Sequence, residues 1–184
     1  MNLFPIGHYV GERQPEGLHY VRVGMEHQTM TPDEFGVWVL THTESPVWTD
    51  DDVLALADKA ELPAAAEALA RLTSVGAVAS AADEQAFARR YRLMPLLVGL
   101  GNTEAHPDTY TIGLPGSPAA RVNAGSYELW QWSALAPTLW HTCEVRAKVT
   151  EDPVSAAELV ADVLAETRPL LANSCAYLDL AGTP

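Results

Sequence analysis

The alternation of apolar and polar positions predicts a strand followed by a helix near the start of the chain. Residues 18–24 are rich in aromatic and β-branched side chains and end in a glycine, as short strands often do. Thr31, Pro32 and Glu34 have the spacing of a helix capping box. The side chains that follow recur at the spacing i, i+3, i+4, i+7 of one helix face, namely Phe35, Trp38, Val39 and His42. We therefore expect an amphipathic first helix.

Two more helices and a returning strand are expected next. Thr49 precedes three aspartates, and carboxylates in a first turn favour the positive end of a helix dipole. Pro63 suits the start of a third helix, and Gly76 suits its left-handed C-cap. Residues 77–79 then return as a strand. The predicted order is strand, helix, helix, helix, strand.

The second part of the chain predicts a similar order. Residues 96–101 and 109–113 form a strand pair around a polar turn, and Ser126 is expected to cap the first helix of this part. Residues 139–148 are the expected second helix. Ser155 begins another capping box and is expected to open the third helix.

The end of that third helix is less regular in sequence. Pro169 predicts a kink or an early end, because proline lacks the amide hydrogen that a helix needs. Asn173 is expected to take the C-cap role that Gly76 has in the first part. Residues 175–180 alternate as a strand, and residues 83–91 are an expected helical connector.

Comparison of the sequence with itself indicates an internal duplication. The matches at an offset of 90 are Leu3 with Leu93, Phe4 with Met94, Pro5 with Pro95, Gly11 with Gly101 and Tyr20 with Tyr110. The matches at an offset of 92 are Phe35 with Tyr127, Trp38 with Trp130 and Trp48 with Trp140. We expect these aromatic positions to form a repeated core. The predicted organisation is a first unit over residues 1–82, a connector over 83–92 and a second unit over 93–184.

The order of elements resembles that of a winged helix, and residues 72–78 (LTSVGAV) are similar to the exit of the third helix and the first wing strand of many bacterial winged-helix domains. The resemblance covers residues 18–80 and identifies no specific family. It implies an α+β fold of two tandem winged-helix-like units. Because many winged helices bind DNA or proteins, it also implies a binding role.

Composition and charge restrict the possible partners. The 184 residues include 48% hydrophobic and 19% charged side chains, as in globular proteins. The formal charge of −13 disfavours nucleic acid and anionic membranes. Two cysteines, Cys143 and Cys175, are too few for a disulfide framework, and no apolar run is long enough to span a bilayer. We expect a cytoplasmic protein with buried structural thiols.

No motif in the sequence assigns a catalytic residue, a metal site or a cofactor. A nucleophile elbow, a phosphate-binding loop and a complete dinucleotide-binding loop are all missing from the sequence. The six histidines do not have the spacing of a zinc site. We therefore expect no metal and no cofactor.

The leading hypothesis is a non-enzymatic adaptor or regulatory module that binds a protein or peptide. Trp132 is the first candidate contact residue, because it lies off the expected core face, although it could instead pack between the two units. The other candidates are the basic residues of the connector, Arg89, Arg90 and Arg92. One alternative is a DNA-binding regulator. A second is an enzyme or small-ligand binder with a pocket between the units that encloses His106, Trp132 or His141.

Overall fold

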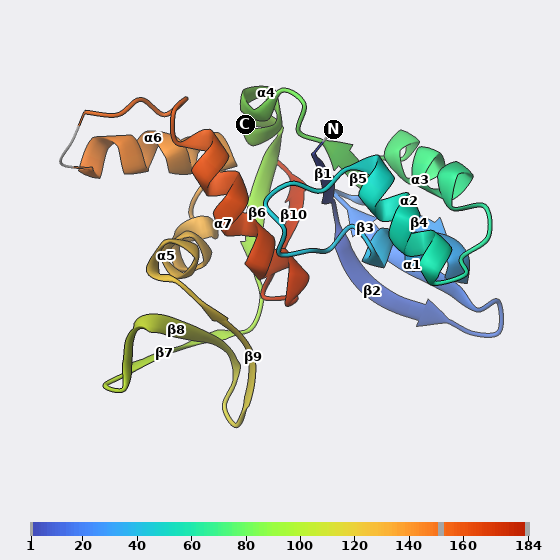
Figure 1. The fold of residues 1–184 in the computed structure, drawn as a ribbon, viewed down its shortest axis with the longest axis horizontal. Helices are drawn as coiled ribbons and strands as arrows, with labels where there is room; N and C mark the ends of the chain where they lie inside the picture. Colours follow the sequence, from blue (N-terminus) through green and yellow to red (C-terminus); the bar gives the residue numbers. More distant parts are fainter. Residues whose placement is uncertain (1, 151–152, 183–184) are drawn as a thin grey trace.

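The chain has an α+β fold in which small antiparallel sheets and short helices form two halves on either side of a central pair of strands (Figure 1). The computed structural model describes residues 2–150 and 153–182. Each half contains a three-stranded sheet and a two-stranded sheet within these residues. The two-stranded sheets lie between the outer elements of the two halves (Figure 1).

The first half begins with four strands, continues with three helices and ends with a strand. These elements are β1 (Leu3–Pro5), β2 (His8–Arg13), β3 (Leu18–Val23), β4 (Glu26–Met30), α1 (Pro32–Val39), α2 (Asp50–Lys59), α3 (Ala65–Ser74) and β5 (Val78–Ser80). The second half repeats this order after the connecting helix α4 (Glu84–Arg90). Its elements are β6 (Tyr91–Pro95), β7 (Val98–Thr103), β8 (His106–Leu114), β9 (Ser117–Val122), α5 (Ala124–Ser133), α6 (Leu139–Val149), α7 (Val160–Ala172) and β10 (Ala176–Leu180).

The first and last strands of each half pair with each other, and a tryptophan secures each pair. β1 pairs antiparallel with β5, and β6 pairs antiparallel with β10. The indole N–H of Trp38 donates to the carbonyl of Ala77 at 3.0 Å, and that of Trp130 donates to the carbonyl of Cys175 at 2.9 Å. Each bond joins the first helix of a half to the segment that follows its third helix. The expected match between these two tryptophans therefore extends to their hydrogen bonds.

The sequence pattern missed three strands of the first half. Only residues 18–24 were expected as a strand before the first helix, whereas β1 pairs with β5, and β2 and β4 flank β3 to form the sheet β2-β3-β4. β2 and β4 are edge strands that carry Glu12, Arg13 and Glu26 at exposed positions. Their side chains do not alternate between apolar and polar, so the period-two pattern of a half-buried strand is missing from both segments.

Most of the expected helix starts are confirmed. Thr31 and Thr49 each form a reciprocal capping box, with Glu34 and Asp52 respectively. Ser155 and Glu158 also exchange hydrogen bonds, although α7 itself begins at Val160. These caps could be predicted because both partners lie within three residues of each other.

Three expectations about the second half were wrong in detail. Asn123, not Ser126, caps α5, and its side chain accepts from the Ser126 amide at 2.8 Å. Of the kink or early end expected at Pro169, the early end does not occur, because α7 continues to Ala172 and buries Leu170 and Leu171 in the core. Asn173 is the C-cap of α7, but the left-handed residue is Ser174, with a φ of 52°, where the first half has Gly76 at 75°.

Two of the sequence matches between the halves do not occupy equivalent positions. In the sheets, His19 lies opposite Met30 and stacks on Phe35, while Tyr110 lies opposite Val122 and stacks on Tyr127. Tyr110 therefore corresponds to His19 and not to Tyr20. Trp48 precedes the cap of α2, whereas Trp140 lies inside α6, after its Thr138 cap. The similar spacing of these two tryptophans does not reflect a shared position.

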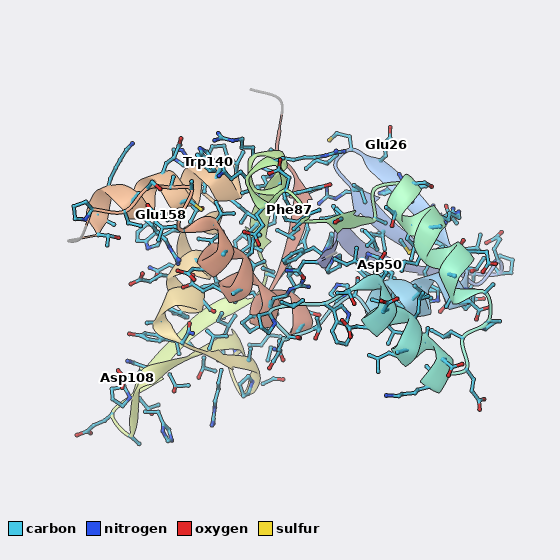
Figure 2. All side chains as sticks on the ribbon, turned by 45° about the horizontal axis from the view of Figure 1, so that its top comes forward. Glu26, Asp50, Phe87, Asp108, Trp140 and Glu158 are labelled. Carbon is cyan, nitrogen blue, oxygen red and sulfur yellow. The ribbon has the colours of Figure 1, made fainter. Side chains whose placement is uncertain are left out.

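The halves are joined through β10 of the second half. The carboxylate of Asp179, 2% exposed, accepts from Arg22 at 2.9 Å and from the Gly24 amide at 2.7 Å. The Gly7 amide donates to the carbonyl of Leu178 at 2.7 Å. Figure 2 shows Phe87 of α4 near the middle of the molecule, where its ring lies 5.0 Å from that of Phe4. Polar and aromatic contacts thus fix one half against the other.

Arg168 is buried in the same interface. It has no exposed surface, its guanidinium lies 3.6 Å from the ring centroid of Phe4, and it donates to the side-chain oxygen of Asn2. The Ala77 amide donates to the carbonyl of Leu72, and the Cys175 amide donates to that of Leu170. Leu170 is therefore equivalent to Leu72, and Arg168, two residues earlier, is equivalent to Ala70. Ala70 is exposed. The third helix of the second half is therefore covered on a side that α3 leaves open.

We predict that Trp38→Phe and Trp130→Phe each lower the free energy of unfolding by about 2 kcal/mol, because each removes one indole hydrogen bond and some packing. Urea denaturation followed by far-ultraviolet circular dichroism measures this change. Trp132→Phe is the matched control and should change stability by less than about 0.5 kcal/mol, since Trp132 makes no core contact of this kind. Equal effects at all three positions would contradict the role assigned to the two indole bonds.

Candidate functional site

An apolar groove lies between α5 and α6 on the outside of the second half. Its volume is about 450 Å³. Four of its side chains are large, apolar and solvent-exposed: Trp132 (58%), Leu135 (76%), Val145 (46%) and Val149 (76%). Such a concentration of exposed apolar side chains marks an interaction surface more often than a structural one. The exposure of Trp132 excludes the alternative that it packs between the halves.

The two helices expose this groove because their opposite faces hold them in the core. α5 buries Ser126, Leu129 and Ser133, and α6 buries Leu139 and Cys143. Val145 and Val149 of α6 are exposed and line the groove, whereas Trp140 packs against the core beside Arg89. The groove therefore results from two helices that are apolar on more than one side.

Polar groups at the groove are few and mostly engaged. His141 lies beside Trp132 in the lining, with its ring nitrogen 3.6 Å from a carboxylate oxygen of Glu144. Arg146 forms an ion pair with Glu166 and donates to the carbonyl of Gly125 at 2.9 Å. His106 lies elsewhere, exposed on β8 near the hairpin end that Figure 2 marks with Asp108. The structure thus places Trp132 and His141 in one groove, but this groove lies within the second half and not between the two units, and it does not include His106.

The connector arginines do not form one patch with Trp132. Arg89 lies with its guanidinium carbon 3.5 Å from the ring centroid of Trp140, and Arg90 lies 5.6 Å from that of Tyr91. Arg92 is half-buried on β6. These cations are divided between α4 and a strand. Arg89 and Arg90 lie against aromatic rings, and the Nε of Arg92 is buried without a hydrogen-bond partner among the described residues.

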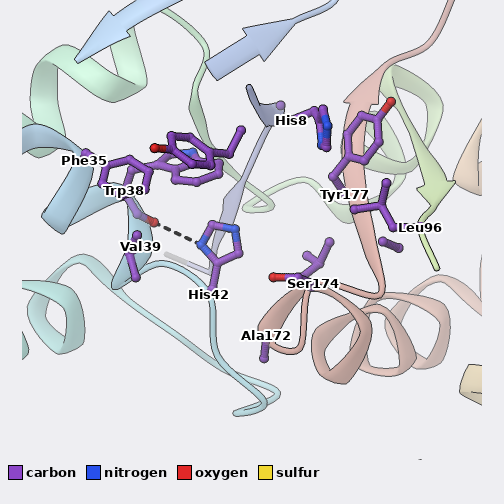
Figure 3. A pocket seen from close by; sticks show the side chains of 13 residues that line it. His8, Phe35, Trp38, Val39, His42, Leu96, Ala172, Ser174 and Tyr177 are labelled. Atoms are coloured by element: carbon purple, nitrogen blue, oxygen red, sulfur yellow. Dashed lines mark hydrogen bonds between the residues drawn. The ribbon is translucent and has the colours of Figure 1, made fainter. Parts of the chain in front are cut away.

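A second cavity, the inter-half cleft, lies between the first half and the end of α7 with β10 (Figure 3). Its volume is about 380 Å³. On one side it is lined by the four residues that the sequence placed on one face of the first helix: Phe35, Trp38, Val39 and His42. Leu171, Ser174 and Tyr177 line it from the second half. The helical spacing of these residues was the signal for the cleft, but it was interpreted as a core face alone.

The histidines of the inter-half cleft are held in the neutral form. Burial, with a contribution from the nearby positive charge of Arg168, lowers the pKa of His42 to about 4. Its Nδ1 lies 3.2 Å from the carbonyl of Trp38, which can only accept, so Nδ1 carries the hydrogen. The other nitrogen, Nε2, is then an acceptor that Figure 3 shows turned toward the open cleft. Burial and Arg22 likewise lower the pKa of His8.

The cysteines are buried and free, as expected. Burial raises the pKa of both Cys143 and Cys175 to about 11, so neither is a thiolate at neutral pH.

In residues 2–150 and 153–182, no three His, Cys, Asp or Glu side chains are grouped closely enough to hold a metal ion. Over the same residues, no helix has the length and apolar character needed to cross a membrane.

We predict that stability falls as the pH drops from about 6.5 to about 4, because the unfolded chain binds a proton at His42 that the folded chain does not. Because the folded-state pKa is lowered, the contribution of neutral His42 to the free energy of unfolding is complete above pH 6.5 and is lost as the pH falls. It amounts to about 3 kcal/mol for a shift of this size. His42→Gln keeps a donor for the Trp38 carbonyl without titrating. Chemical denaturation over this pH range should give a shallower dependence for His42→Gln, and equal slopes would contradict the assignment.

Comparisons with known proteins provide no relative from which a role for either cavity could be transferred. No family model matches the chain, and neither a curated protein nor a solved structure matches it. A role for the α5–α6 groove or the inter-half cleft is therefore inferred from the residues that line each of them.

Proposed function

We propose that the chain is a non-enzymatic protein-binding module built from two winged-helix-like units, and that its partner docks in the groove between α5 and α6. The observation that carries this proposal is the exposure of Trp132, Leu135, Val145 and Val149 along one groove. Tryptophan is enriched among the residues that dominate binding energy at interfaces. A groove between two helices suits an amphipathic helix that inserts its apolar face.

The repeated order of elements supports the two-unit description. A small antiparallel sheet, three helices and a returning strand occur in both halves, and the bonds of Trp38 and Trp130 correspond. These features are expected if one ancestral unit of about ninety residues was duplicated. The three-stranded sheet precedes the helices in each half.

The charge of the chain favours a cationic partner. A formal charge of −13 attracts positively charged segments and repels a second copy of the same chain. Glu128 lines the groove and is exposed. We therefore expect an amphipathic helix with apolar residues on one face and lysine or arginine on its flanks.

The alternative of a DNA-binding regulator has less support. In α3, Arg71 pairs with Glu34 at 3.2 Å and donates to the carbonyl of Thr29 at 2.9 Å. In α7, Arg168 is buried, and Glu166 pairs with Arg146. Both third helices thus have their arginine engaged within the described part of the chain, while phosphate binding requires free cations.

We predict that a photo-crosslinking amino acid at position Leu135 captures one defined partner in cells that naturally make the protein, because this side chain is 76% exposed in the groove. The matched control carries the crosslinker at Val47, which is 62% exposed in the loop between α1 and α2. Mass spectrometry identifies the adduct. The purified partner should then bind the wild-type chain, with Trp132→Ala weakening binding at least about tenfold.

The cationic flanks of the partner can be tested in the same complex. The affinity measured by titration calorimetry should fall as salt increases, since screening weakens attraction between opposite charges. Identical adducts at Leu135 and Val47, or an unchanged affinity for Trp132→Ala, would overturn the proposal. A partner that binds equally well at low and high salt would contradict the cationic flanks alone.

A further inference from the structure

The inter-half cleft has the lining of a site for a flat, uncharged group. Aromatic rings follow one another along its first-half wall, with centroid distances of 4.7 Å for Tyr9–Phe35, 5.8 Å for Phe35–Trp38 and 4.4 Å for Trp38–His42. On the other side, the rings of His8 and Tyr177 lie 4.7 Å apart. None of the 13 lining residues is Asp, Glu, Lys or Arg. A charged ligand would find no counterion there, whereas aromatic faces favour a planar ring.

Two polar groups from opposite halves face this apolar space. The neutral His42 presents Nε2 as an acceptor, because its Nδ1–H is committed to the Trp38 carbonyl. The hydroxyl of Ser174, which belongs to the second half, lies on the same side of the cleft as His42 (Figure 3). Ser174 holds a left-handed φ of 52° at the position where the first half has a glycine, Gly76. A non-glycine residue in this conformation is strained, and such strain is concentrated at functional sites.

We propose that the inter-half cleft binds a planar aromatic group carrying a hydrogen-bond donor, such as an indole N–H or a phenol O–H, with the donor directed at Nε2 of His42. The cleft volume of about 380 Å³ falls within the range of small-molecule sites. A ligand that fills the cleft covers Nε2 of His42, so a ligand that supplies a donor gains affinity over one of the same shape that leaves this acceptor unpaired. This role is independent of the α5–α6 groove and would hold if that groove had no partner.

Indole and benzofuran are the matched probes, because they share a shape and differ in the N–H donor. Titration calorimetry at pH 7 should detect indole with a dissociation constant of roughly 0.1 mM, and benzofuran should bind about tenfold more weakly. The ring nitrogen signals of His42 in ¹⁵N NMR spectra should report the Nδ1–H tautomer and shift at Nε2 when indole is added.

Three variants separate the site from the fold. Val39→Trp places a larger side chain at a 45% exposed position in the lining and should abolish binding of both probes. His42→Phe should remove the preference for indole over benzofuran. His106→Phe, on the exposed β8, is the control and should leave both affinities unchanged. If His42→Phe fails to fold, Ser174→Gly replaces it, since glycine relieves the positive φ and removes the hydroxyl, and indole affinity should fall severalfold.

A side chain and a free molecule could both supply this chemistry, and a third probe distinguishes them. N-acetyl-Gly-Trp-Gly-amide presents the same indole on a peptide. Tighter binding of this peptide than of indole assigns the cleft to a side chain of a protein, and weaker binding assigns it to a free molecule. The proposal is overturned if neither form of indole binds at its solubility limit, if benzofuran binds as tightly as indole, or if Val39→Trp binds indole normally.

Discussion

The buried carboxylate of Asp179 is the interaction on which the arrangement of the two halves depends. It is a single charge with 2% exposure. Two of its hydrogen-bond partners, Arg22 and the Gly24 amide, come from the other half, and a third, the Leu180 amide, follows it on β10. A carboxylate that loses such partners remains buried and uncompensated, which costs several kcal/mol. The strand that carries it, β10, also closes the second half against β6. Closure of that half and its docking on the first half are therefore coupled.

Docking gives the repeated elements different surroundings, so that equivalent positions serve different purposes. Gly99 in the second half leaves room for the hydroxyl of Tyr127, which would lie 2.3 Å from a Cβ at that position. In the first half, Tyr9 lies at the corresponding strand position, and its ring packs on the smaller Phe35 at 4.7 Å. The first half thereby lines the inter-half cleft with aromatic rings. The corresponding face of the second half does not contribute to that cleft.

The parts of the fold that sequence predicts are those set by neighbours in the chain. The capping boxes at Thr31 and Thr49, the strand pair β7–β8 and the connecting helix α4 depend on residues within a few positions of one another. The edge strands β2 and β4 were missed, because their identity depends on pairing with β3. Pro169 was misjudged for a similar reason: the local penalty of a proline is offset by packing that only the complete fold provides.

The candidate sites also differ in how far the sequence alone predicts them. An exposed role for Trp132 could be inferred from the helical spacing, which places it off the core face of α5. The inter-half cleft could not be inferred from the sequence, since a helix face of apolar and aromatic side chains has the same pattern whether it packs in a core or lines a cavity. The burial of Arg168 likewise depends on contacts with Phe4 and Asn2 of the other half, which lie far away in the sequence.

Amide hydrogen exchange measured by NMR at neutral pH tests most directly the claim that β10 holds the two halves together. The amides of Gly7 and Gly24 donate to Leu178 and Asp179 across the junction. They should exchange as slowly as core amides such as that of Val21, and exchange at both should accelerate together in Asp179→Asn. Fast exchange of the two glycine amides in the wild-type chain, with the core still protected, would show that the halves are not joined in this way.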